Sequence, residues 1–135
     1  MSIISQTSLQ ASSPDLLVPN LVCDPSVNVG DWVRWSGSTL VQAFADSKDD
    51  ANVFGLVEVK TASTVATVRI AGVSSALFVG LDNSKEYFLS DITPGGMTVQ
   101  GTNIPTAAGH VVLSLGQPLD AQRFLVQKGT RLVRS

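Results

Sequence analysis

The side chains that could carry covalent chemistry are few in this sequence. His110 is the only histidine and Cys23 the only cysteine, so a serine or cysteine nucleophile would have to use His110 as its base. No serine lies in the G-x-S-x-G turn that presents the nucleophile of many hydrolases. His110 lies at the entry to an apolar stretch, and we expect it to be structural or exposed. Cys23 has no cationic neighbour in sequence, which predicts a small packing side chain.

The densest group of acidic residues lies at residues 46–52, Asp-Ser-Lys-Asp-Asp-Ala-Asn. Its oxygens suit calcium, but the segment lacks the alternating ligands, the glycine and the closing glutamate of an EF-hand loop. We therefore expect a solvated hairpin loop. One histidine and one cysteine predict no zinc site. Pro94-Gly95-Gly96 precedes a strand-like stretch rather than a helix, so no phosphate cradle and no cofactor are predicted.

Length and composition narrow the class of protein. A chain of 135 residues fits one domain. Hydrophobic residues make up 44% and charged residues only 15%, a balance that, with many valines and only two glutamates, favours strands over helices. The net charge of −2 provides no basic field for nucleic acid, and no apolar run approaches the length of a membrane span. Neither nucleic acid nor a membrane is an expected partner, and we expect synthesis in the cytoplasm.

Short apolar stretches are separated by Gly, Asn and Asp at the spacing typical of β-sandwiches and barrels. Thr67 and Arg69 alternate with Val68 and Ile70, which predicts a strand with one buried and one wet face. The sequence thus predicts an all-β domain over residues 27–135, a small antiparallel β-sandwich or barrel. Its expected strands lie near residues 32–35, 39–45, 53–60, 64–71, 76–79, 87–90, 97–99, 111–115, 123–127 and 130–133.

Residues 1–26 differ from the rest of the chain. They contain no Lys or Arg, many serines and three prolines, and we expect them to form an extended N-terminal arm. The arm carries too many apolar residues for a solvated linker, namely Leu16, Leu17, Val18 and Leu21. The arm therefore lies on a neighbouring subunit, or it forms the first strand of the domain's own core. The sequence leaves both possibilities open.

Aromatic and basic residues suggest further contacts. Trp32 and Trp35 are three residues apart, a spacing that sends them to opposite faces of a strand. One then belongs to the core and the other is an exposed interface anchor, unless a twist or bulge hides both. Basic residues gather near the carboxyl end, where they are solvated strand positions or contacts for an acidic protein partner. The predicted partner-interface residues are Leu16, Leu17, Val18, Leu21, Trp32, Trp35, Arg131 and Arg134.

A series of glycine-marked hairpins extends over residues 27–127. It comprises VNVGDWV from residue 27, AFADS from 43, VFGLV from 53, IAGV from 70, YFLSD from 87, PGGMT from 94 and GHVV from 109, which leads into LG at 115. This succession resembles a small β-domain of tailed-bacteriophage virion proteins, found in capsid decoration (cement) proteins and near the ends of tail fibres.

The resemblance implies a structural protein without enzymatic activity, commonly oligomeric. We expect a capsid decoration protein, a trimer that binds the major capsid protein or other virion subunits across subunit boundaries and stabilises the shell. Its location would be the virion, assembled in the host cytoplasm. The alternative is a tail-fibre or spike module that recognises a host-surface glycan, for which Trp35 and residues 46–52 are the best support. A small hydrolase is the third class, and it would need His110 to contact both an acid and a serine.

Overall fold

The computed structural model describes residues 15–135. Within this range the chain forms strands and no helix, which confirms the predicted all-β fold. Accordingly, the described part has no helix of the length and hydropathy that crossing a membrane demands. The strands are β1 (Leu16–Val22), β2 (Trp32–Ser36), β3 (Thr39–Gln42), β4 (Gly55–Ala62), β5 (Val65–Val73), β6 (Tyr87–Leu89), β7 (Met97–Val99), β8 (Val111–Val112), β9 (Ser114–Pro118), β10 (Phe124–Val126) and β11 (Leu132–Val133).

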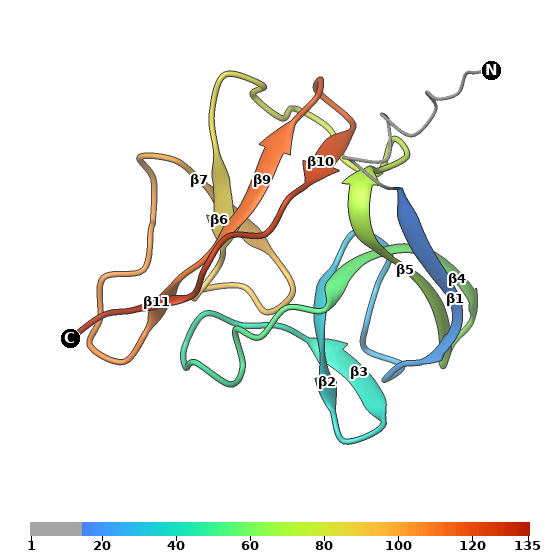
Figure 1. The fold of residues 1–135 in the computed structure, drawn as a ribbon. Helices are drawn as coiled ribbons and strands as arrows, with labels where there is room; N and C mark the ends of the chain where they lie inside the picture. The colour runs from blue at the N-terminus through green and yellow to red at the C-terminus, as the bar shows by residue number, and fades with distance from the viewer. Residues whose placement is uncertain (1–14) are drawn as a thin grey trace, which may run out of the picture.

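Nine strands form one antiparallel sheet in the order β3-β2-β4-β5-β10-β9-β6-β7, with β1 also paired to β5, while β11 and β8 form a separate pair. Strand β5 joins the two parts of the sheet, because its residues 65–71 pair with β1 and β4 whereas Gly72 and Val73 pair with β10. Figure 1 shows β1 to β5 curling together beside β6, β7, β9 and β10. The sheet does not close into a barrel, and the fold is consistent with a small sandwich.

The apolar side chains form two cores on opposite faces of β2 and β4. Trp32 and Leu56 belong to the first core and their neighbours Val33 and Val57 to the second, because successive strand residues face opposite sides. Both faces are covered only at the start of β2 and β4, and there the strands carry apolar runs rather than a clean alternation. The first core adds residues of β6, β8, β9 and β10, among them Tyr87, Leu89, Val111, Leu115, Phe124 and Val126; the second adds Cys23, Val27, Leu40, Ala66 and Val68.

Two glycines allow strands to approach more closely than a side chain would permit. A Cβ on Gly55, at the start of β4, would lie 2.5 Å from the carbonyl oxygen of Arg69. A Cβ on Gly116 in β9 would lie 2.1 Å from the carbonyl oxygen of Leu125, and Gly116 has a φ of +132°. Only glycine, which has no Cβ, permits these close approaches and the positive φ of Gly116 without strain.

Residues 76–79 do not form the strand that their composition predicted. The backbone turns here, with the Leu77 amide donating to the Ser75 carbonyl (2.8 Å) and the Phe78 amide to the Gln122 carbonyl (3.1 Å). Leu77 and Phe78 pack against the first core, while Val79 is 85% exposed. The apolar residues of this segment therefore anchor a loop to the first core, although their pattern predicts a strand.

Several other predicted strands are shorter than expected, and two of them show why. β3 ends at Gln42, although Ala43 and Ala45 remain buried because the loop packs against the first core, where the Ala45 amide donates to the Ser90 carbonyl (3.0 Å). The predicted strand at residues 111–115 divides at Leu113. Its first part, β8, pairs with β11, and the second, β9, pairs with β10 and β6.

Strand β1 pairs antiparallel with β5 of its own domain, so residues 16–22 take the place of a first strand, one of the two arrangements predicted for the arm. The pairing shifts register between Leu16 and Leu17 and again between Val18 and Leu21. The second shift includes Pro19 and Asn20, whose φ is +60°. Such bulges change which residues face each side of a sheet. Residues 1–14 of the predicted arm lie outside the described residues.

Candidate interaction surface and its supporting polar network

The register of β1, β4 and β5 places several aliphatic side chains on the face turned away from the second core. Residues paired across antiparallel strands share a face. Ala66 and Val68 of β5 belong to the second core, so the residues that alternate with them face the other way. The strand partners of these alternating β5 residues form a surface that we call the outer face: Leu16, Leu17 and Val22 of β1, and Val59 of β4.

The outer face is substantially exposed. Leu16, Leu17, Val22 and Val59 expose 47%, 45%, 53% and 47% of their surface. Leu16 and Leu17 lie on the same side because the register shift between them cancels the alternation of consecutive strand residues. Isolated apolar residues are ordinary on a protein surface, whereas a group of them on strands joined through β5 is a candidate interaction site.

The other predicted arm contacts face the domain itself. Val18 pairs with Val68 and Leu21 with Ala66, and both partners belong to the second core. These two β1 residues are three apart, and the bulge at Pro19 and Asn20 returns Leu21 to the inward side. Leu21 packs against the second core. Of the four arm residues predicted to contact a partner, Leu16 and Leu17 are therefore placed for it, and Val18 and Leu21 are not.

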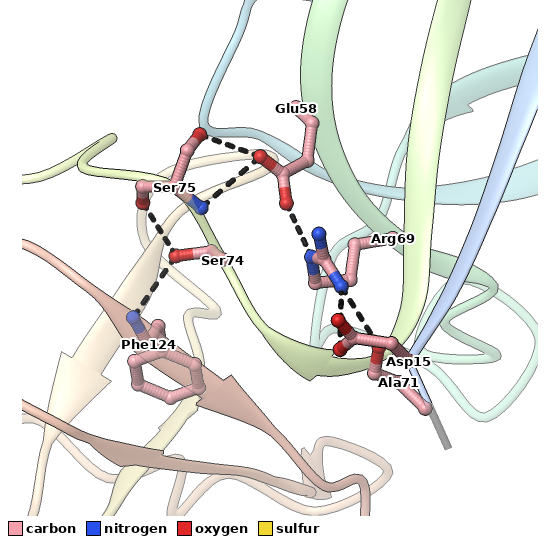
Figure 2. Close-up of polar contacts among 7 residues, drawn as sticks. All are labelled: Asp15, Glu58, Arg69, Ala71, Ser74, Ser75 and Phe124. Carbon is pink, nitrogen blue, oxygen red and sulfur yellow. Dashed lines mark hydrogen bonds and ion pairs between the residues drawn. The ribbon is translucent and has the colours of Figure 1, made fainter.

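A buried polar network lies where β1 begins and β5 bends toward β10 (Figure 2). The Arg69 guanidinium donates through Nε to a Glu58 carboxylate oxygen, and through a terminal nitrogen to Asp15 Oδ1 (3.0 Å) and the Ala71 carbonyl (3.2 Å). The other Glu58 oxygen accepts from the Ser75 amide (3.1 Å) and hydroxyl (2.5 Å). The network thus ties Asp15, the first described residue of the chain, to β4, to β5 and to the segment that follows β5.

Ser74 extends this network to the second half of the sheet. Its hydroxyl accepts from the Phe124 amide of β10 (2.9 Å) and donates to the Ser75 carbonyl (2.8 Å), as Figure 2 shows. Burial raises the pKa of Glu58, but the hydrogen bonds from Ser75 and Arg69 outweigh burial, and the net pKa lies below its ordinary value. Glu58 is therefore an anion at neutral pH, matched to the Arg69 cation.

This network is not among the features predicted from the sequence. Thr67 and Arg69 were predicted to face water, yet Arg69 is only 8% exposed because Glu58 and Asp15 cover its guanidinium. The available signal was Glu58 itself, a charged residue between Val57 and Val59 in an apolar stretch, since charges are rarely buried unless they are paired. Its partner, Arg69, could not be predicted from the sequence, because the two residues lie on different strands and meet only through the pairing of β4 with β5.

The tryptophans divide as predicted. Trp32 is fully buried and contacts Phe124 edge to face at a centroid distance of 5.5 Å, whereas Trp35 is 38% exposed and packs against Phe54 at 5.2 Å. Burial of Trp32 removes it from the predicted interface residues, because its ring has no surface to offer a partner. Trp35 keeps an exposed aromatic edge at the β2–β3 hairpin.

Arg131 and Arg134 fasten the carboxyl end to the domain. Arg131 donates to the Lys48 carbonyl (2.7 Å), and Arg134 donates through Nε to the Pro105 carbonyl (2.9 Å). Neither contact involves a carboxylate. Arg134 is largely exposed, so its charge stays available to a partner.

His110 contacts an acid, with Nδ1 2.8 Å from Asp91 Oδ2. Among the described residues, no serine hydroxyl is hydrogen-bonded to this imidazole. Nearby, Asp50 pairs with Arg34 (3.0 Å). Burial and a hydrogen bond to Asp50 raise the pKa of Asp46 above its ordinary value. The described residues hold no cluster of ligating side chains suited to a metal ion.

Comparison of the chain with family models, with curated proteins and with solved structures gave no match.

Proposed function

We propose that the chain is a structural virion protein, a capsid decoration protein that attaches to the shell through its outer face. The observation that carries the proposal is the group of half-exposed aliphatic side chains at Leu16, Leu17, Val22 and Val59. Burying this surface against another subunit removes apolar area from water, the dominant favourable term in most protein association. The resemblance of residues 27–127 to phage virion β-domains supplies the kind of partner, the major capsid protein.

The surroundings of the outer face suit adhesion rather than catalysis. Arg69 lies on the same side of β5 as Leu17, its strand partner, and the Glu58–Arg69 pair fixes the strands that present the aliphatic side chains. A surface that is rigid before binding loses less conformational entropy on association. The proposed trimer would present three such surfaces, and binding at several sites multiplies weak contacts.

The location of the chain is tested by counting copies. Mass spectrometry of purified virions from the strain that encodes the chain should find it at hundreds of copies, comparable with the major capsid protein. A few to several dozen copies would favour the alternative, a tail-fibre or spike module that recognises a host glycan. Exposed Trp35 supports that alternative, because aromatic rings at surfaces anchor ligands. Absence from the particle would exclude both.

The role of the outer face is tested by a matched pair of substitutions. Leu17→Asp introduces a charge into the outer face, and Leu119→Asp does the same at a leucine of nearly equal exposure, 47% against 45%, beyond the end of β9. We expect Leu17→Asp to weaken co-sedimentation with particles lacking the protein by about tenfold or more. Leu119→Asp should bind normally. Equal binding by both variants would exclude the outer face as the attachment site.

Point substitution is preferable to removal of the arm. Deleting residues 1–26 would also remove β1, which pairs with β5, and Cys23, which belongs to the second core. Loss of binding by such a deletion would therefore report a damaged domain as readily as a lost contact.

A further inference from the structure

A polar hollow opens beside β6, β7, β9 and the end of β10. None of these strands pairs with β1 or β4, the strands that carry the outer face. The volume of the hollow is about 560 Å³, within the range of ligand pockets. It lies where β6 begins and β7 ends, beside β9 and the residues after β10, a region that can be followed in Figure 1. The lining residues are Ser84, Glu86, Gln100, Ser114, Gly116, Gln117, Gln127, Lys128 and Gly129.

Several of these side chains are held in place by the protein. Gln117 donates to the Asn83 carbonyl (2.8 Å), Gln100 accepts from the Glu86 amide (3.1 Å), and the Ser114 hydroxyl donates to the Glu86 carboxylate. Each of these bonds uses only part of the side chain's capacity: the Gln117 oxygen, the Gln100 amino group and the second Glu86 oxygen remain for a ligand. Gln127 makes no side-chain hydrogen bond to the described residues, so both ends of its amide are available.

The chemistry of the lining selects the ligand class. It contains no aromatic or aliphatic side chain, which disfavours an apolar molecule. Glu86 disfavours an anion, and Lys128, another lining residue, carries a positive charge that disfavours a cation; its ammonium donates to the Val53 carbonyl (2.7 Å). The remaining ligand class is a neutral molecule whose groups both donate and accept hydrogen bonds, as hydroxyls do. Such groups match the amides and the carboxylate of the lining.

We propose that this hollow binds a neutral saccharide unit. Amide side chains satisfy vicinal hydroxyls by accepting from one and donating to the next, and the Glu86 carboxylate accepts from a hydroxyl. Without an aromatic ring to stack on the sugar, the affinity for a single residue is expected to be weak, in the millimolar range. The proposal is independent of shell binding, since a decoration protein or a fibre module could each carry such a site.

The test is a titration of the isotope-labelled full chain by heteronuclear NMR. The probes are methyl α-D-glucopyranoside, methyl α-D-mannopyranoside, methyl β-D-galactopyranoside and N-acetylglucosamine, with glucuronate as an anionic comparison and a matching neutral disaccharide to distinguish a free sugar from part of a glycan. We expect saturable shifts at the backbone amides of Glu86, Gln117 and Gln127 with at least one neutral probe, and weaker binding of glucuronate. No saturable shift with any neutral probe would overturn the proposal.

Two variants locate the site. Gln127→Ala removes an amide from the hollow, whereas Gln122→Ala removes an exposed amide outside it. We expect Gln127→Ala to raise Kd about tenfold, the effect of losing one hydrogen bond, and Gln122→Ala to leave it unchanged. Gly129→Val is a second check. A Cβ at Gly129 makes only an ordinary contact of 3.5 Å with Ser114, so the added side chain should occupy the hollow while the spectrum stays that of a folded protein. Equal Kd values for the wild type and for both Gln127→Ala and Gly129→Val would place the sugar elsewhere and refute the assignment, whatever the outcome of the particle-binding experiment.

Discussion

Replacing Glu58 with glutamine is the sharpest test of the polar network behind the outer face. The substitution keeps the size of the side chain but removes its charge. In one orientation of the glutamine amide its amino group faces the Nε of Arg69, and in the other it faces the two Ser75 donors, so one set of donors loses its acceptor. Arg69 is 8% exposed, and its remaining acidic partner Asp15 has a side chain that is 73% exposed. Breaking one partner of a buried ion pair costs about 3–5 kcal/mol. For a chain of this length that corresponds to a fall in Tm of roughly 10–20 °C.

The matched control is Asp15→Asn, which removes the other carboxylate of Arg69 from a site open to water. An exposed ion pair contributes about 0–1 kcal/mol, so this variant should unfold close to the wild type. Urea titration followed by tryptophan fluorescence measures both free energies of unfolding. If Glu58→Gln costs no more than Asp15→Asn, the ion pair is not the element that holds β4 and β5 together.

The pH dependence of unfolding gives a second signature of the same residue. The pKa of Glu58 in the folded protein lies below its ordinary value of 4.5. The unfolded chain therefore binds the proton more tightly, and the stability from this group is present above pH 4.5 and lost as the pH falls through the lower, folded pKa. The difference in unfolding free energy between wild type and Glu58→Gln should be largest near neutral pH and shrink in acid. A constant difference down to about pH 3 would contradict this account.

The fold class could be predicted from the sequence because the signals for strands are local. Valine-rich stretches broken by glycine predict strands wherever they occur, and the spacing of Trp32 and Trp35 predicts opposite faces from strand geometry alone. Both predictions hold in the structure. The same local reasoning failed at residues 76–79, where apolar side chains anchor a loop to the first core, because composition does not reveal whether backbone hydrogen bonds go to a strand or to a turn.

The candidate sites depend on information that no local pattern carries. Val59 of β4 joins the outer face only because it pairs with Thr67 of β5. Leu16 and Leu17 share that face only because the pairing of β1 with β5 shifts register between them. The hollow combines Glu86, Gln117 and Gln127, residues brought together by the pairing of β9 with β6 and β10. Strand register is set by packing of the whole sheet, so it could not be read from the segments separately.

Two further substitutions test how burial and backbone geometry shape the domain. Asp46→Asn should stabilise the protein at pH 7 and much less at pH 3, because burial and Asp50 raise the pKa of Asp46 in the folded state. The ionised carboxylate therefore destabilises the fold at neutral pH, and this cost disappears when acid protonates it. Urea unfolding at the two pH values checks this, and equal effects would contradict the assigned pKa shift. Gly116→Ala should cost about 3 kcal/mol or more, since the new Cβ would lie 2.1 Å from the Leu125 carbonyl oxygen. The control is Gly37→Ala at the β2–β3 turn, where φ is also positive (+62°) but nothing lies within 4 Å, so only the conformational cost of about 1 kcal/mol applies. Thermal unfolding separates the two terms: similar losses at both positions would mean that β9 and β10 can move apart, and that the close approach of these strands is not required for the fold.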